Sequence, residues 1–261
     1  MEMSRKIDLN SDVGESFGTY KLGLDEEVIP LITSANIACG WHAGDPGVMR
    51  RTIALAKQHG VAPGAHPGFP DLLGFGRRNM DATLEEIEDY TTYQIGALSA
   101  FASEQSMSLQ HVKPHGGLYN MAAKDTRIVE AVAKVLSRLN KELILVTLAG
   151  PHRKEIEEIG DCYGIRIGFE FFADRGYNSD GTLVSRRESG AVIHDHQVAA
   201  QRVLKMVREG KVISREGTEI ALSAHTICVH GDNPSAVLLT GTIREALIHS
   251  DIAVAPMRTF I

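Results

Sequence analysis

Four histidines of this chain stand in one local context: an apolar segment precedes each of them and a glycine turn follows it. They are His42, His66, His115 and His230. A histidine side chain exchanges a proton near neutral pH, and its neutral ring binds divalent metal ions. The set therefore predicts either general acid–base groups or, with Asp12, the ligands of a divalent metal. Both remain open, because the sequence holds no HExxH motif.

Segment 8–15 carries two carboxylates and an amide at alternating positions. Asp8, Asn10 and Asp12 lie two residues apart, so they share one face of an extended segment. Burial of such groups is costly unless they bind something. We therefore favour a site here over a plain strand end followed by a turn. Asp12 is expected to act as a base or, with His42 and His66, as a metal ligand.

Lys113 ends an apolar segment, where an ammonium group is either paired or placed to meet negative charge on a reacting oxygen. We expect the second role, and a structural ion pair with Asp12 is the alternative. Asn36 lies in the segment that leads to His42 and is a candidate for substrate binding, as is Asn10.

Residues 170–186 form a long polar stretch with two arginines, Arg175 and Arg186. Long loops in compact domains usually carry function, and we expect this one to cover a cleft. Its arginines predict a bidentate clamp for a carboxylate or phosphate. The alternative is that they pair with Asp174 or Glu188. No GxxxxGK[ST] motif occurs, so a nucleotide would bind without a P-loop.

The elements that must position these residues alternate between short apolar runs and segments of helical period, as expected for parallel strands with crossover helices. The predicted strands are 7–9, 34–38, 61–65, 110–113, 143–148, 166–171 and 226–229. The predicted helices are 46–59, 84–104, 125–139, 151–159 and 196–209. The first helix is supported by Asp45 before Pro46, and the second by the capping-box spacing from Thr83. We expect Gly160 to end the fourth helix.

Nearly every predicted strand ends in charged or histidine-bearing sequence. Function gathers at the carboxyl ends of parallel strands both in a barrel of the triosephosphate-isomerase type and in a doubly wound sheet. Strands around a closed ring can direct all these residues into one central cleft, whereas an open sheet spreads them along an edge. We therefore predict a barrel, distorted or incomplete. Since nothing marks a domain boundary, we predict one domain over 1–261.

The composition of the chain argues against several classes of protein. It has 261 residues, 43% of them hydrophobic, and 27 basic against 33 acidic residues, for a net charge of −6. This balance argues against nucleic acid as a partner. The start lacks the apolar core of a signal peptide, and no apolar run approaches the ~18 residues that span a bilayer. We expect a cytoplasmic protein without a membrane partner, whose three cysteines stay reduced.

The chain resembles the LamB/YcsF family, which is the A subunit of the bacterial 5-oxoprolinase. The resemblance runs nearly end to end and rests on six blocks in the same order, at 8–15, 35–45, 64–71, 112–120, 172–186 and 229–234. It implies a distorted, seven-stranded β/α barrel related to the glycoside hydrolase/deacetylase superfamily. It also implies ATP-dependent opening of 5-oxo-L-proline to L-glutamate, carried out with partner subunits B and C.

Within that activity, we assign roles to individual residues from their chemistry. The expected catalytic residues are Asp12, His42, Lys113 and His115; the expected substrate-binding residues are Asn10, Asn36, Arg175, Arg186 and His230; the expected metal ligands are Asp12, His42 and His66. ATP is the expected cofactor, and a divalent metal is either Mg²⁺ with ATP or an ion of the site itself. Two rivals are a metal-dependent deacetylase or carbohydrate hydrolase, and a non-catalytic scaffold.

Overall fold

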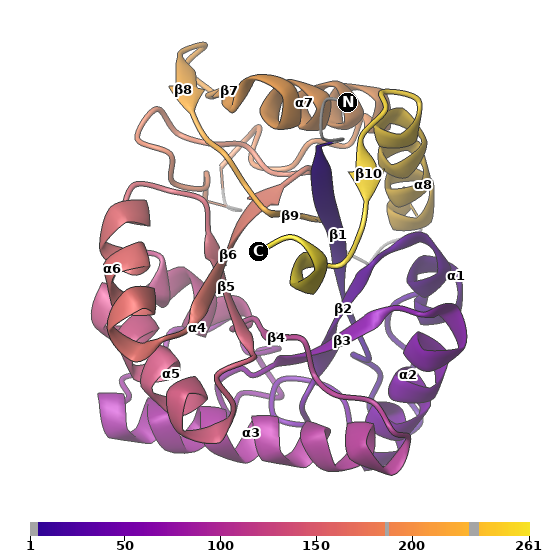
Figure 1. Cartoon of the computed structure of the whole chain (residues 1–261), viewed down its shortest axis with the longest axis vertical. Helices are drawn as coiled ribbons and strands as arrows, with labels where there is room; N and C mark the ends of the chain where they lie inside the picture. The colour runs from indigo at the N-terminus through magenta and orange to yellow at the C-terminus, as the bar shows by residue number, and fades with distance from the viewer. Residues whose placement is uncertain (1–4, 186–187, 230–234) are drawn as a thin grey trace.

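Seven parallel strands close into a barrel in the computed structural model, which describes residues 5–185, 188–229 and 235–261 (Figure 1). The strands are β1 (Lys6–Val13), β2 (Ser34–Ala38), β3 (Ala62–His66), β4 (His111–Val112), β5 (Ile144–Leu148), β6 (Arg166–Phe172) and β9 (Thr226–Cys228). Neighbours pair in this order, and β9 returns to β1 in a register that runs from Asp8 opposite Thr226 to Asn10 opposite Cys228. Closure leaves none of these seven described strands at a free edge, and it confirms the predicted barrel over the open sheet.

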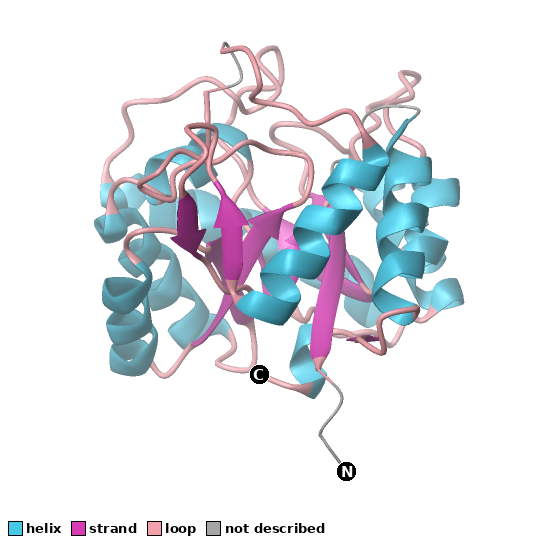
Figure 2. Ribbon diagram, turned by 90° about the horizontal axis from the view of Figure 1, so that it is seen from above, coloured by secondary structure: helices cyan, strands magenta, loops and turns pink. Residues whose placement is uncertain are grey.

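Helices cover the outside of the barrel. They are α2 (Pro46–His59), α3 (Leu84–Glu104), α5 (Thr126–Leu139), α6 (Arg153–Tyr163), α7 (His196–Glu209) and α8 (Ser235–Ile248). The predicted starts of α2 and α3 are confirmed: Asp45 accepts a hydrogen bond from the Val48 N–H, and Thr83 and Glu86 form a capping box. Figure 2 shows the loops after the strands gathered at one end of the barrel, with the carboxyl terminus at the opposite end.

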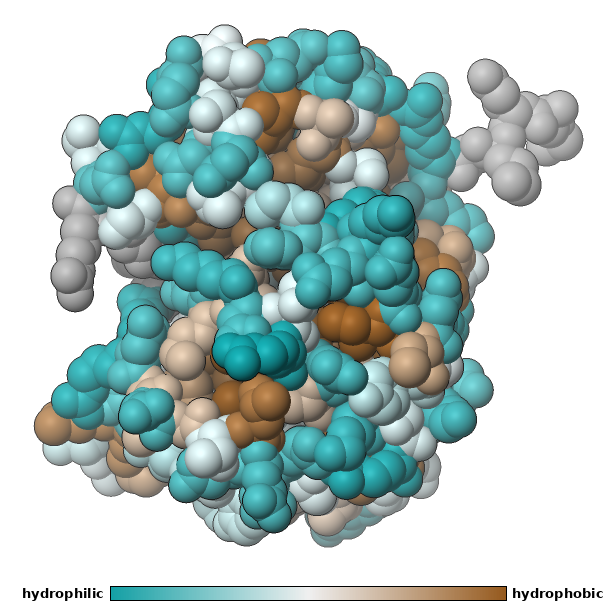
Figure 3. Space-filling model, turned by 90° about the vertical axis from the view of Figure 1, so that its left-hand side faces the viewer, coloured by the Kyte–Doolittle hydropathy of each residue, from teal (hydrophilic) through white to brown (hydrophobic). Residues whose placement is uncertain are grey.

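α5 illustrates how the helices are oriented. Its apolar residues, including Val132, Val135 and Leu136, are buried against the barrel. Figure 3 views the side on which α5 and α6 lie, where hydrophilic side chains cover most of the surface and interrupt the hydrophobic patches. None of the helices in the described part of the chain is both long enough and apolar enough to cross a membrane.

The predicted end of α6 at Gly160 is wrong. The helix continues to Tyr163 and ends at Gly164, whose positive φ of 65° supplies the left-handed cap. Gly160 is needed for close packing instead, because a Cβ there would lie 2.8 Å from the Ile165 carbonyl oxygen and 2.7 Å from the Ile167 side chain.

The 14-residue helix α8 and several short elements were absent from the predicted set. The short elements are α1 (Asp25–Val28), η1 (Ile29–Leu31), α4 (Gly116–Ala122), the antiparallel pair β7 (Lys211–Ile213) and β8 (Glu219–Ala221), β10 (Ala253–Val254) beside β1, and η2 (Met257–Thr259). η2 lies against the amino-terminal side of the barrel, where Met257 packs on Ile144 and Val146. The candidate site residues therefore lie at the opposite end of the barrel.

Candidate active site

A cleft of about 1190 Å³ opens at the carboxyl ends of the strands. Asp12, His66, Lys113, His115 and Arg175, which come from four different strand ends, all line it. Residues of the polar loop predicted to cover a cleft also line it: Asn178, Asp180, Thr182, Leu183, Val184 and Ser185. The structure thus brings five of the ten predicted site residues to the wall of one cleft, and Asn10, Asn36 and His42 lie buried beside them. Arg186 and His230 lie outside the described residues.

The ammonium group of Lys113 lies between two carboxylates at the base of the cleft. Its Nζ is 2.9 Å from Asp12 Oδ1 and 2.9 Å from Glu170 Oε1. Burial alone would lower the pKa of Lys113, but the charges of Asp12 and Glu170 outweigh it and hold that pKa well above its usual value. Lys113 therefore remains a cation, and it also donates to Cys228 Sγ at 3.2 Å.

Asn10 and Asn36 connect Asp12 to Glu170 by a second route, which does not pass through Lys113. Asn10 Nδ2 donates to Glu170 Oε1 at 3.0 Å, and Asn36 Nδ2 donates to Asn10 Oδ1 at 2.7 Å and to Asp12 Oδ1 at 2.8 Å. Together with Lys113, these side chains form a closed hydrogen-bonded ring, which we call the Asp12–Glu170 ring. Both asparagines are buried, so their predicted contact with substrate stays a prediction.

His111, for which the sequence suggested no role, orients Asn36. Its Nε2 lies 2.7 Å from Asn36 Oδ1, which accepts, and its Nδ1 lies 3.2 Å from Gln110 Nε2, which donates. Burial and the nearby Lys113 lower the pKa of His111 to about 3, so its ring is neutral. His111 and Lys113 are two residues apart in one extended segment, and this spacing was the signal that both face the barrel interior.

His66 and His115 face each other through one nitrogen each, because the other nitrogen of each ring is held by the backbone. His66 Nδ1 donates to the Lys113 carbonyl at 2.7 Å, and His115 Nε2 donates to the Phe75 carbonyl at 2.8 Å. These carbonyls only accept, which fixes the tautomers. The remaining His66 Nε2 and His115 Nδ1 are 2.9 Å apart. If both rings are neutral, two lone pairs meet at that distance.

This pair fits a divalent metal ion. Burial and the neighbouring His66 lower the pKa of His115 to about 3, so the His115 ring is neutral and its Nδ1 presents a lone pair. Asp12 Oδ2 lies 3.3 Å from His66 Nε2 and adds an anionic donor. Two nitrogens on a tetrahedral zinc ion are about 3.4 Å apart, so opening the histidine pair by roughly half an ångström admits an ion.

His42 lies against this cluster with a different orientation. Its ring stacks on His115 with 3.7 Å between centroids and 2° between planes, and its Nε2 lies 3.9 Å from Glu15 Oε1. One donor atom from each of Glu15, His42, His66 and His115 lies within 4.8 Å of the others. The lone pairs of two stacked rings lie in separate parallel planes, however, so one ion cannot lie in the ring planes of both His42 and His115. His42 as a ligand stays a prediction that requires its ring to rotate.

Two glycines make room for this crowded site. A Cβ at Gly64 would lie 2.2 Å from the His111 ring, and one at Gly76 would lie 2.6 Å from His42 Cβ and 2.9 Å from the His115 ring. Gly76 also has a positive φ of 61°. Close approach of backbone to imidazole therefore explains these residues without a phosphate-binding role.

Arg175 is buried in the wall of the cleft. Its Nε donates to the Ala191 carbonyl at 3.1 Å and its Nη2 donates to the Val184 carbonyl at 2.6 Å. These bonds fasten the loop that covers the cleft. A contact between Arg175 and a substrate carboxylate stays a prediction.

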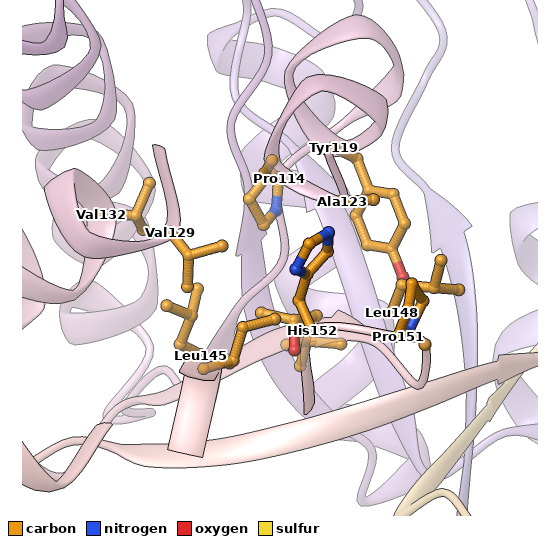
Figure 4. A pocket seen from close by; sticks show the side chains of 14 residues that line it. Pro114, Tyr119, Ala123, Val129, Val132, Leu145, Leu148, Pro151 and His152 are labelled. Atoms are coloured by element: carbon orange, nitrogen blue, oxygen red, sulfur yellow. The ribbon is translucent and has the colours of Figure 1, made fainter. Parts of the chain in front are cut away.

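A small apolar cavity of about 20 Å³ adjoins the cleft (Figure 4). It shares Pro114, Tyr119, Ala123 and Leu148 with the cleft wall. Its remaining lining is mainly aliphatic and includes Leu145. The cavity is too small for a substrate, and the chemistry belongs to the cleft.

The fold and the site together define a β/α-barrel protein with a buried histidine–carboxylate centre at the carboxyl ends of its strands. The chain belongs to the LamB/YcsF family, whose model matches residues 7–261. It is 54% identical over 252 residues to the 5-oxoprolinase A subunit of Alkaliphilus metalliredigens, covering 97% of both chains. It is 56% identical over 256 residues to the 5-oxoprolinase A subunit of Thermococcus onnurineus, covering 98% of this chain and 99% of that one.

Solved structures share the fold of this chain. The crystal structure of the lactam utilization protein from Thermus thermophilus matches with a TM-score of 0.89 and 45% identity, over 96% of this chain and 99% of that one. A putative cellobiose-phosphate cleavage protein from Enterococcus faecalis V583 matches with a TM-score of 0.60 at 13% identity, over 98% of both chains. The second likeness concerns the fold alone.

Proposed function

We propose that this chain is the A subunit of an ATP-dependent 5-oxoprolinase, which opens 5-oxo-L-proline to L-glutamate with formation of ADP and phosphate. The observation that carries the proposal is the identity of more than half of the residues, over nearly the whole chain, with proteins named as the A subunit of 5-oxoprolinase. Subunits B and C are the proposed partners. The need for ATP and the reduced cysteines, Cys39, Cys162 and Cys228, agree with a cytoplasmic enzyme.

The chemistry explains why ATP is required. A five-membered lactam is an unactivated amide whose ring closure is favoured, so its hydrolysis needs coupling to a favourable reaction. Transfer of the terminal phosphoryl group of ATP to the lactam oxygen forms an O–P bond and makes the ring carbon electrophilic. ADP leaves in this step. Water then adds to the ring carbon, the ring C–N bond breaks, and the nitrogen takes a proton to become the amino group, which leaves the side-chain carboxyl as an acyl phosphate. A second water hydrolyses this acyl phosphate to L-glutamate and inorganic phosphate.

Asp12 is the residue best placed to take a proton from the attacking water. Its Oδ1 is held by Lys113 and Asn36, so its Oδ2 faces His66 and the cleft. His115, a neutral ring whose Nδ1 faces His66 Nε2, is proposed to carry the proton that Asp12 takes from the water on to the leaving nitrogen. Lys113 contributes by holding Asp12 in place and by bringing positive charge to the base of the cleft.

A divalent ion would be held by Asp12 Oδ2, His66 Nε2 and His115 Nδ1. When bound, such an ion polarises an oxygen of water or substrate. In that case Asp12 and His66 orient the reacting oxygen, and His42 with Glu15 is the remaining pair able to move a proton. Mg²⁺ is the expected partner of ATP.

The substrate carboxylate requires a cationic or polar contact at the cleft wall. Arg175, Arg186 and His230 are the proposed residues for this contact. Arg175 lines the cleft. Asn10 and Asn36 are proposed to lie below the substrate and to act on it by orienting Asp12.

A metal-dependent deacetylase or carbohydrate hydrolase is the second candidate. The donor set of one carboxylate and two histidines favours it, because three protein ligands with an open position are typical of catalytic zinc sites. This activity would need no ATP and no partner subunits.

The test is reconstitution with omission of one component at a time. This chain, subunits B and C, ATP, Mg²⁺ and 5-oxo-L-proline are mixed, and glutamate and ADP are measured. The proposal expects glutamate only in the complete mixture. ATP-independent release of acetate from an acetylated sugar by the zinc-loaded chain, with no glutamate in the complete mixture, would establish the second candidate instead.

A further inference from the structure

Glu170 is a fully buried carboxylate beneath the cleft. Its Oε1 accepts from Asn10 Nδ2 at 3.0 Å and lies 2.9 Å from Lys113 Nζ. The strand register places it opposite Thr226 of β9 and Leu148 of β5, inside the closed part of the barrel. A charge at such a position is costly unless it is paired, so its partners indicate what it does.

We infer that Glu170 is a positioning residue that acts on Asp12 through Lys113. This inference rests on the proposed function for the reaction it serves. Glu170 and Asp12 hold the Lys113 ammonium from two sides at equal distances of 2.9 Å, so Lys113 cannot turn away from Asp12 without losing a charged partner. The ammonium in turn fixes Asp12 Oδ1, which leaves Oδ2 directed toward His66.

The second half of the Asp12–Glu170 ring supports the same role. Asn10 Nδ2 donates both to Glu170 and, at 2.6 Å, to Thr226 Oγ1, and Asn10 Oδ1 accepts from Asn36, whose amide donates to the same Asp12 oxygen as Lys113 does. Glu170 therefore reaches Asp12 along two chains of hydrogen bonds. Removal of its carboxylate takes one partner from Lys113 and one from Asn10, whereas glutamine keeps an acceptor of similar shape and loses the charge.

Kinetics of the reconstituted complex test the inference. Glu170→Ala should lower kcat by about 10- to 100-fold, the typical effect of losing a hydrogen bond to a charged group. Glu170→Gln should lower it less, and the KM for 5-oxo-L-proline should stay within about twofold because Glu170 is below the substrate. Adding Glu170→Ala to Lys113→Met should cost little beyond Lys113→Met alone.

Glu88→Gln is the matched control. Glu88 is also a carboxylate that pairs with a lysine, 2.7 Å from Lys134 Nζ, but it joins the outer helices α3 and α5. This variant should leave kcat unchanged. Additive losses for Glu170→Ala and Lys113→Met, or a raised KM with normal kcat, would overturn the inference.

A spectroscopic measurement tests whether Glu170 holds Lys113 in place, even if the complex does not act on 5-oxo-L-proline. A buried, paired ammonium exchanges its protons slowly, so Lys113 should give a ¹⁵N-detected NH₃⁺ signal in this chain. The signal should disappear in Glu170→Ala, move but persist in Glu170→Gln, and remain unchanged in Glu88→Gln. An unchanged signal in both Glu170 variants would show that Asp12 holds Lys113 without help. Absence of glutamate with the expected signals would refute the proposed function alone.

Discussion

Replacement of Asp12 by asparagine separates catalysis from stability at this site. The asparagine side chain keeps an oxygen for Lys113 and Asn36, which lie 2.9 and 2.8 Å from Asp12 Oδ1 in the unsubstituted chain. Lys113 also keeps its ion pair with Glu170 at 2.9 Å. The variant therefore keeps both hydrogen bonds and loses only the negative charge that strengthens them. We expect the free energy of unfolding to fall by about 1–2 kcal/mol. For a chain of this size each kilocalorie lowers the melting temperature by about 2–4 °C.

The effect on catalysis should be much larger. An amide at position 12 cannot accept a proton from water or bind a divalent ion as a carboxylate does. Loss of a general base typically lowers the rate about 10²- to 10⁴-fold. Asp12→Asn should therefore reduce glutamate formation by at least a hundredfold in a complex that is folded.

The assay is glutamate formation by the reconstituted complex at 15 °C, with thermal unfolding of the same variant as the control. The low temperature keeps a moderately destabilised variant folded. A clearly lowered melting temperature with near-normal turnover at 15 °C would refute the reasoning, because it would make Asp12 a structural partner of Lys113.

Lys113→Met should destabilise the fold more than Asp12→Asn does, because it leaves the carboxylates of Asp12 and Glu170 buried without a cation. We expect the free energy of unfolding, measured by urea denaturation, to fall by about 3–5 kcal/mol. The double variant His66→Ala/His115→Ala should abolish binding of Co²⁺ or Zn²⁺ in isothermal titration, and Glu15→Gln should retain it; equal binding by the double variant would exclude the Asp12–His66–His115 centre. Stability should also depend on pH through His111, whose pKa falls from 6.5 to about 3 on folding. Below pH 6.5 the unfolded chain binds a proton that the folded chain does not, so stability falls as the pH falls toward 3, by up to about 1.4 kcal/mol per pH unit. His111→Gln should remove this contribution, and equal slopes of unfolding free energy between pH 6 and 4.5 in variant and wild type would contradict it.

The seven barrel strands and five of the outer helices, α2, α3, α5, α6 and α7, were predictable because each has a local signal. Asp45 before Pro46 sets the start of α2, and apolar runs followed by polar turns set the seven strands. Closure of the barrel was predictable from the polar residues at nearly every strand end. The end of α6 was not, because Gly160 resembles a helix stop in sequence, whereas its neighbours in space, Ile165 and Ile167, require a glycine inside the helix.

The candidate site was only partly predictable. The glycine turns identified His66 and His115, and the alternation in β1 identified Asp12. Glu170 was visible at a strand end, but its link to Lys113 crosses the barrel, and no spacing in the sequence encodes it. The orientation of His42 follows from stacking on His115. Contacts between strands far apart in the chain therefore decide which residues act and which position them.

The most direct test of the proposed activity is the amount of glutamate and ADP formed in one reaction of the complete system with 5-oxo-L-proline. We expect equal amounts of the two products in the wild-type complex, and no glutamate when this chain is omitted or carries Asp12→Asn. Glutamate formation by subunits B and C without this chain, or undiminished glutamate formation with Asp12→Asn, would contradict the assignment of ring opening to the cleft of this barrel.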